Sequence, residues 1–195
     1  MDPGGGGTPS GPTAEVWLTT ADQSHLLSRQ PDVVIRSGTD ASSIVISVDE
    51  GTSYQEIVGF GAAMTDASAY LIQHKLAGQH DAILHELFGR NPGIGLSFLR
   101  VPMGASDFST HDYSYDDMPA GQTDSTLAHF SLDEDRADKL PALKAALAIN
   151  PQLKLVASPW SPPGWMKTTG SLIQGTLRPE FYDSFAQYFR KFIEG

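Results

Sequence analysis

Short runs of β-branched and other apolar residues recur through the first quarter of the chain. They cover residues 16–20, 33–35 and 44–48, and clusters of Ser, Asp and Gly separate them. Runs of this length and composition are typical of strands. We therefore predict antiparallel strands of a small accessory β-sheet over residues 15–52.

The pattern of apolar positions changes after this region. Apolar runs at residues 57–63, 96–101 and 153–157 have the length of buried strands, and each is followed by a segment with helical periodicity. The order strand, helix, strand, helix, strand, helix indicates an α/β fold with parallel pairing and right-handed crossovers.

Cap and breaker residues predict where the helices begin and end. Thr65 and Asp66 open one helix, and Gly89 suits a left-handed cap at the end of another. Ser131 and Glu134 have the spacing of a capping box. Pro141 predicts a break near residue 138 and a new helix with the proline in its first turn.

The last helix, opened by Pro179, carries aromatic residues at helical spacing. We expect this face to pack in the core rather than to bind a cofactor. Its residues are Phe181, Phe185, Tyr188, Phe189 and Phe192.

The long loops and unusual residues follow the predicted strands. Those strand ends carry residues 64–66, 103–108 and 158–167, and a polar loop without regular pattern covers residues 104–130. Functional sites of parallel α/β folds form at this edge of the sheet. A loop of that length is functional or disordered.

Composition narrows the classes of function. The hydrophobic fraction of 40% allows a core, and 13 basic against 23 acidic residues argue against a nucleic-acid or anionic-membrane partner. No cysteine is present, which excludes disulfides, thiolate zinc sites and a cysteine nucleophile.

Gly59 and Gly61 lack the third glycine of a dinucleotide motif. We expect no cofactor.

The loop at residues 158–167 holds two tryptophans among three prolines. Trp160 and Trp165 are either core residues or a rigid platform for the apolar face of a sugar ring. Asp107, at the preceding strand end, is either a sugar-binding carboxylate or a loop cap. Arg100 lies within an apolar strand, so we expect a carboxylate partner inside the fold.

Three aspartates of the long loop raise the question of a metal site. Asp112, Asp116 and Asp117 do not have the spacing of a recognised ligand loop, so a solvated loop face explains them better. The histidines on helical segments lack HExxH spacing. We expect no metal ion.

Several segments, in order from about Glu56 onward, resemble glycoside hydrolase family 30, in particular its glucosylceramidase branch. They read GFGAAMTDAS, LSFLRVPMGASDFS, YSYDD, FSLDED and ASPWSPPGWMK. The resemblance implies a (β/α)8 TIM barrel beside a β-sandwich built partly from N-terminal strands. Residues 53–195 would form the first part of the barrel, about three βα units. Residues 15–52 would supply sandwich strands, and residues 1–14 a flexible Gly/Pro linker.

The same resemblance implies a retaining β-glycosidase that acts on a β-glucoside or a glucosylceramide-type substrate. It implies that Asp107 and Trp160 bind the sugar of the first subsite, and that Arg100 supports the catalytic carboxylates from below. No cofactor, metal ion or nucleic acid is implied.

The family's two catalytic glutamates are not matched in this chain. The acid/base glutamate lies in an Asn-Glu-Pro segment after the fourth barrel strand, and the nucleophile comes later. Gly195 precedes both, and Glu194 falls near the end of a helix. We therefore expect an inactive N-terminal part that needs the remainder of the barrel. The alternatives are a non-catalytic carbohydrate-binding module and an α/β domain without a carbohydrate role.

The N-terminus lacks the basic and apolar regions of a signal peptide. Its Gly/Pro-rich start resembles a linker left after removal of an export or anchor segment, or a cloning remnant. We expect the protein to act outside the cell or in the cell envelope.

Overall fold

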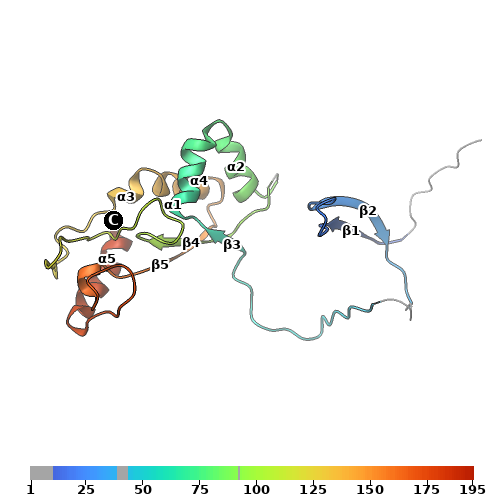
Figure 1. Cartoon of the computed structure of the whole chain (residues 1–195). Helices are drawn as coiled ribbons and strands as arrows, with labels where there is room; N and C mark the ends of the chain where they lie inside the picture. The colour runs from blue at the N-terminus through green and yellow to red at the C-terminus, as the bar shows by residue number, and fades with distance from the viewer. Residues whose placement is uncertain (1–10, 39–43, 92) are drawn as a thin grey trace, which may run out of the picture. The chain divides into compact units, whose positions relative to one another are not determined.

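A computed structural model describes residues 11–38, 44–91 and 93–195. The chain divides into two compact units, the first ending at Tyr54 and the second beginning at Gln55. In Figure 1 the colour runs along the whole chain, from blue at the N-terminus to red at the C-terminus.

The first unit contains a two-stranded antiparallel sheet. Strand β1 (Thr13–Leu18) pairs with β2 (Ser28–Val34), with an irregularity in register near residue 15. The predicted third strand at residues 44–48 is wrong, because this segment forms no strand, and Ile44 is 96% exposed. A β-branched run forms a strand only where a neighbouring strand completes its hydrogen bonds and covers one face.

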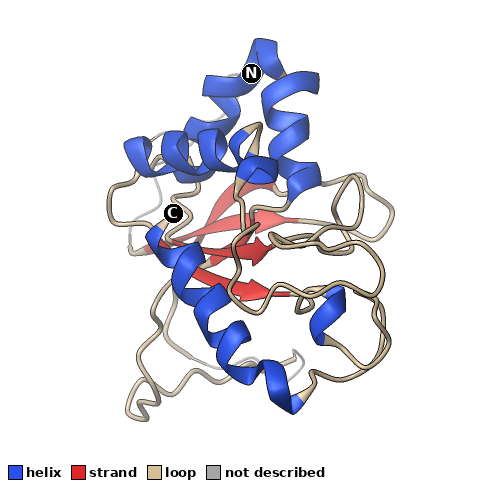
Figure 2. Cartoon of the chain, turned by 90° about the vertical axis from the view of Figure 1, so that its left-hand side faces the viewer, coloured by secondary structure: helices blue, strands red, loops and turns tan. Residues whose placement is uncertain are grey.

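The second unit is built on a three-stranded parallel sheet. Its order is β3 (Gly61–Ala63), β4 (Phe98–Met103) and β5 (Lys154–Pro159). The predicted alternation of strands and helices with parallel pairing is confirmed. In Figures 1 and 2, the helices that follow β3 and β4 group on one side of the sheet, whereas the final helix lies on the other.

The first helical segment has several turns of different geometry. Helix α1 (Asp66–Tyr70) continues as a π-turn η1 (Leu71–Lys75), a 3-10 turn η2 (Ala77–Gln79) and helix α2 (His80–Phe88). The predicted cap at Thr65 is confirmed, because its hydroxyl accepts from the Ser68 amide at 3.2 Å.

The expected left-handed cap at Gly89 is wrong. Gly89 has φ −70° and ψ 151°, which is extended backbone, and its amide donates to the His85 carbonyl. The chain leaves α2 in an extended conformation toward β4, so no left-handed residue is needed there.

The predicted break near residue 138 is confirmed. Helix α3 (Asp133–Arg136) ends before it and α4 (Lys139–Ile149) begins after it, with Pro141 in the first turn. The capping box does not form. Because α3 begins only at Asp133, the Ser131 hydroxyl accepts from the Asp133 amide at 3.1 Å and not from Glu134.

The last two segments follow β5. A 3-10 turn η3 (Gly164–Met166) lies in the tryptophan loop, and a 3-10 turn η4 (Pro179–Phe181) leads into helix α5 (Tyr182–Glu194). Among the described residues, no helix has the length and apolar character needed to span a membrane.

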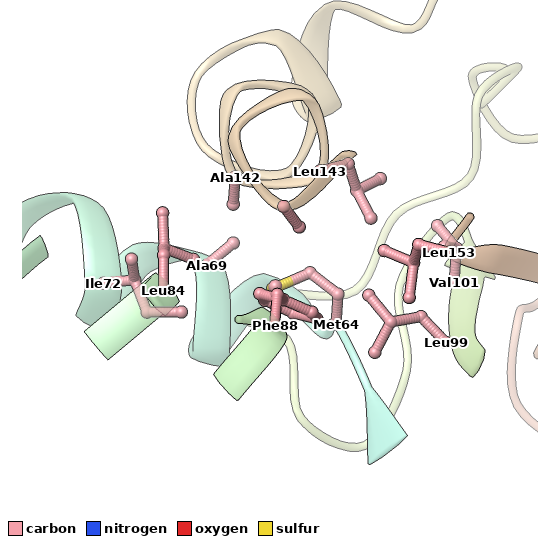
Figure 3. Close-up of a cluster of buried hydrophobic side chains, with 11 residues drawn as sticks. Met64, Ala69, Ile72, Leu84, Phe88, Leu99, Val101, Ala142, Leu143 and Leu153 are labelled. Atoms are coloured by element: carbon pink, nitrogen blue, oxygen red, sulfur yellow. The ribbon is translucent and has the colours of Figure 1, made fainter. Parts of the chain in front are cut away.

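One hydrophobic core lies between the sheet and helices α1, α2 and α4. Figure 3 shows Ala142 and Leu143 of α4 pointing toward side chains of the sheet and of α1. The buried members are Met64, Ala69, Ile72, Leu84, Phe88, Leu99, Val101, Ala142, Leu143, Ala146 and Leu153. This core fixes the strands whose ends carry the predicted site.

A second core, largely aromatic, lies beneath the long loops and against α5. It contains Met103, Tyr113, Tyr115, Leu127, Leu132, Trp165, Met166, Phe181 and Tyr188. Tyr188 is fully buried, and the other aromatic residues of α5 pack partly buried around it, which confirms this face as core. The 104–130 loop is anchored by this core, so it is ordered rather than disordered.

Candidate functional site

A cavity of about 410 Å³ opens beside the loops that follow β4 and β5. Asp107 comes from the first loop and Trp160 from the second, so the two predicted sugar-binding residues line the same cavity. Parallel strands place their carboxyl ends at one edge of the sheet, which explains the juxtaposition. The lining residues also include Asp112, Tyr113, Ser161, Lys167 and residues 172–175.

The two tryptophans have different roles in the structure. Trp165 is 8% exposed, its indole Nε1 donates to the Asp116 carbonyl at 2.8 Å, and its ring meets Phe181 edge-on. Trp160 is 58% exposed and lines the cavity. Trp165 is therefore a core residue, and Trp160 offers an aromatic face to a ligand.

Asp107 is exposed at the cavity, and no hydrogen bond or ion pair from the described residues reaches its carboxylate. Its neighbours make the turn instead: the Ser106 hydroxyl accepts from the Phe108 amide, and the Ser106 amide donates to the Ser109 hydroxyl at 2.8 Å. Asp107 is thus not a loop cap in this structure, and its carboxylate is available to a ligand.

Arg100 has no carboxylate partner among the described residues, so that expectation is wrong. Its Nε donates to the Ser158 hydroxyl at 3.0 Å, and its guanidinium lies 5.8 Å from the centroid of the Trp160 ring. Arg100 is only partly buried, so solvent reduces the cost of its charge. It contacts Trp160 from the neighbouring strand without being among the cavity-lining residues.

Sequence reasoning did not single out Lys167 as a site residue. Its side chain is buried, and Nζ donates to the Ser161 hydroxyl at 2.9 Å and to the Leu172 carbonyl at 2.7 Å. Burial lowers its pKa. A bridge between Lys167 and Leu177 closes the hairpin whose tip forms one cavity wall. The available signal was that Lys167 is the last residue of the tryptophan loop at residues 158–167.

Asp116 also differs from expectation, because it is buried rather than on a solvated loop face. Its side chain is 1% exposed, and neither carboxylate oxygen has a partner among the described residues. Burial raises the pKa of Asp116 to about 6. Within the described ranges, no group of three or more acidic or histidine side chains is arranged to hold a metal ion.

The second unit of the chain matches a known family of enzymes. Residues 57–195 match the glycosyl hydrolase family 30 TIM-barrel domain. The chain belongs to glycosyl hydrolase family 30. This confirms the resemblance seen in the sequence, and the fold is that of a partial TIM-barrel domain, with no closed barrel among the described residues.

Relatives within family 30 include enzymes of two kinds. The chain is 38% identical over 92% of its length to putative glucosylceramidase 4 of Caenorhabditis elegans, covering 35% of that protein. It is 34% identical over 82% of its length to the lysosomal acid glucosylceramidase of Mus musculus, covering 32% of it. An endo-1,6-β-D-glucanase of Neurospora crassa is 33% identical over 92% of this chain and 39% of its own length.

Solved structures show the same fold. An endo-β-1,6-glucanase aligns with TM-score 0.70 and 32% identity, over 95% of this chain and 40% of its own. SrfJ of Salmonella typhimurium aligns with TM-score 0.75 and 27% identity, over 93% and 41%. The chain therefore spans about a third of the length of the curated relatives it matches.

The carboxylates that line the cavity beside β4 and β5 are aspartates. Asp107 and Asp112 line it, and none of the glutamates does. The described residues thus bring together the unpaired Asp107 carboxylate and the exposed Trp160 ring, without the pair of glutamates that the family resemblance implies.

Proposed function

We propose that this chain forms the sugar-binding wall of a retaining β-glycosidase that hydrolyses a β-glucoside or glucosylceramide-type substrate. One observation carries the proposal: the unpaired Asp107 carboxylate and the exposed Trp160 ring line the same cavity. The glucosylceramidases and glucanases among the relatives support a β-linked glucose unit as the ligand.

The two side chains complement a hexose physically. A carboxylate accepts strong hydrogen bonds from neighbouring hydroxyls, and an indole ring packs against the apolar C–H face of the sugar. Arg100 supports this arrangement by holding the Trp160 ring from the adjacent strand. Its proposed contact with the catalytic carboxylates depends on residues that this cavity does not contain.

Hydrolysis requires more than this wall. Retaining enzymes use two carboxyl groups about 5–5.5 Å apart, one as nucleophile and one as acid/base. Because no glutamate lines the cavity, we expect the purified chain to bind sugar without cleaving it. Release of nitrophenol from an aryl β-glucoside by the chain, lost on Asp107→Ala, would contradict this expectation.

Binding of methyl β-glucoside to the 195-residue chain, followed by NMR titration, tests the proposal. Asp107→Ala and Trp160→Ala should each weaken binding at least tenfold, because each removes an interaction of about 1.5 kcal/mol or more. Tyr182→Ala is the matched control for Trp160, since Tyr182 is 57% exposed on α5, outside the cavity. Equal affinities for Trp160→Ala and Tyr182→Ala would overturn the proposal.

A stand-alone carbohydrate-binding module would share the binding result but not the exposed sheet. Strand β5 pairs only with β4 among the described residues, and its Leu155 and Val156 are 44% and 42% exposed. An apolar strand edge of this kind promotes association with other strands. This favours part of a larger barrel over a free-standing module.

A further inference from the structure

A buried charge network lies beside the cavity, at the starts of helices α1 and α4. Lys139 is 1% exposed, and its Nζ lies 3.1 Å from Asp66 Oδ1 and 2.9 Å from Asp135 Oδ1. Nζ also donates to the Pro102 carbonyl and to the Tyr113 hydroxyl. The Lys139 ammonium and the Asp135 carboxylate are thus held out of water beside the partly buried Asp66 carboxylate, and several hydrogen bonds satisfy them.

Tyr113 connects this network to the cavity. Its hydroxyl lies within hydrogen-bonding distance of two acceptors, Asp66 Oδ1 at 2.9 Å and Asp135 Oδ1 at 3.1 Å, and Tyr113 is one of the residues that line the cavity. Asp66 Oδ1 is therefore fixed from two directions, by an ammonium and by a phenol. Its other oxygen, Oδ2, makes a separate contact.

That second oxygen holds the turn that carries Asp107. The Ser109 hydroxyl donates to Asp66 Oδ2 and accepts from the Ser106 amide at 2.8 Å. One residue further along α1, the Ala67 amide donates to the Phe108 carbonyl at 2.9 Å. Residues on both sides of Asp107 are thus tied to the start of α1.

We propose that Asp66 is a positioning residue for Asp107. Through Ser109 it fixes the 106–109 turn, and the Lys139 network fixes Asp66 in turn. Asp107 has no partner of its own among the described residues, so the turn sets where its Cα–Cβ bond points. A fixed backbone lowers the conformational entropy that Asp107 loses when its carboxylate binds hydroxyls. This inference rests on the proposed sugar-binding function of Asp107.

Ser109→Ala is the sharpest test, because it removes the link while leaving the buried charges intact. We expect a three- to tenfold weaker affinity for methyl β-glucoside, about the value of one hydrogen bond. Ser109→Thr keeps the hydroxyl and should bind within about twofold of wild type. Thr110→Ala is the matched control, since among the described residues the exposed Thr110 hydroxyl hydrogen-bonds only to His111.

A double-mutant cycle separates positioning from general loosening of the fold. Ser109→Ala made in the Asp107→Ala chain should cause no further loss of affinity, because the residue it positions is gone. An equal loss in both backgrounds would overturn the proposal, as would unchanged affinity in the single variant.

A readout without sugar distinguishes failure of this inference from failure of the proposed function. Backbone amide order parameters for residues 106–109 should fall in Ser109→Ala and stay at wild-type values in Thr110→Ala. If they fall while wild type and Asp107→Ala bind methyl β-glucoside equally, the positioning holds and the sugar-binding function fails. If they do not fall, Asp66 does not position Asp107.

Discussion

Two buried ionisable side chains, Lys139 and Asp116, differ in whether they have polar partners. Lys139 is surrounded by two carboxylates, a carbonyl and a phenol, whereas both oxygens of Asp116 lack a partner among the described residues. A buried charge without a partner is costly, and a carboxyl group avoids that cost by binding a proton. The two residues therefore predict different responses to mutation and to pH.

Asp116 should make the stability of the chain depend on pH. Burial, followed by the nearby charge of Asp124, raises its pKa from 3.8 in the unfolded chain to about 6. The folded state holds this proton more tightly than the unfolded state does. The contribution of Asp116 to the stability of the fold is therefore fully present below about pH 4 and is lost as the pH rises through about 6. Its size is up to about 3 kcal/mol.

Asp116→Asn removes this titration. Urea unfolding at pH 4 and at pH 7.5 should show the variant gaining stability relative to wild type as the pH rises. Asp124, Asp117 and His129 also interact with this carboxyl group, so their titration enters the difference only through that coupling. Parallel pH profiles for variant and wild type would refute the prediction.

Lys139→Met should destabilise the chain by about 3–5 kcal/mol, because it leaves the buried Asp135 and the partly buried Asp66 without a cation. The measurement is the free energy of unfolding in urea. Lys144→Met on the same helix is the control, because Lys144 is exposed, and it should change stability by less than about 0.5 kcal/mol. Equal effects of the two substitutions would show that the network does not hold the fold.

Connections between elements, more than the elements themselves, shape the cavity. Strand β4 ends at Met103, and the chain then turns at Gly104, which has φ +81°; a Cβ there would lie 3.1 Å from the Tyr113 carbonyl. Gly121, in the same long loop, has the same φ of +81°, but a Cβ at that position would have nothing within 4 Å. The pair separates backbone strain from crowding.

Gly104→Ala should therefore cost more stability than Gly121→Ala. The positive φ costs about 1 kcal/mol in either variant, and the contact with the Tyr113 carbonyl adds to it only at Gly104. We expect Gly104→Ala to weaken methyl β-glucoside binding as well, since the strain falls at the base of the Asp107 loop. Thermal unfolding and NMR titration of both variants provide the measurements, and equal losses would exclude the close approach as a cause.

On the scale of the whole molecule, the second unit leaves an edge of its sheet, at β5, unpaired among the described residues. Beyond β5, no further strand pairs within the described residues, and apolar side chains of that strand reach solvent. In a TIM barrel each strand has a neighbour on both sides, and the open edge is what a partial barrel leaves.

The chain should consequently self-associate as its concentration rises. Light scattering after size exclusion should show oligomers at high micromolar concentration, and Val156→Lys should reduce them, because a charge on a strand edge opposes edge pairing. A monodisperse, cooperatively melting monomer that binds glucoside would instead support a stand-alone carbohydrate-binding module.

Local patterns predicted most of the elements of the second unit. Buried-type apolar runs, the helix break at Pro141 and the aromatic face of α5 each depend on residues close together in sequence. The meeting of Asp107 and Trp160 was also predictable, because parallel strands end at a common edge. Errors arose where a partner was required, as for the unpaired segment at residues 44–48 and the Ser131 cap.

The sequence by itself indicated the family through the resemblance of its motifs. Short-range periodicity and turn chemistry determined the order of strands and helices and the edge of the sheet at which the site forms. Only the tertiary structure decided that Arg100 contacts Ser158 and Trp160, that Asp116 is buried alone, and that Asp66 joins Lys139 to the Asp107 turn. Those contacts join residues that lie tens of positions apart along the chain. No local pattern encodes such distant pairs, because packing of the whole unit brings them together.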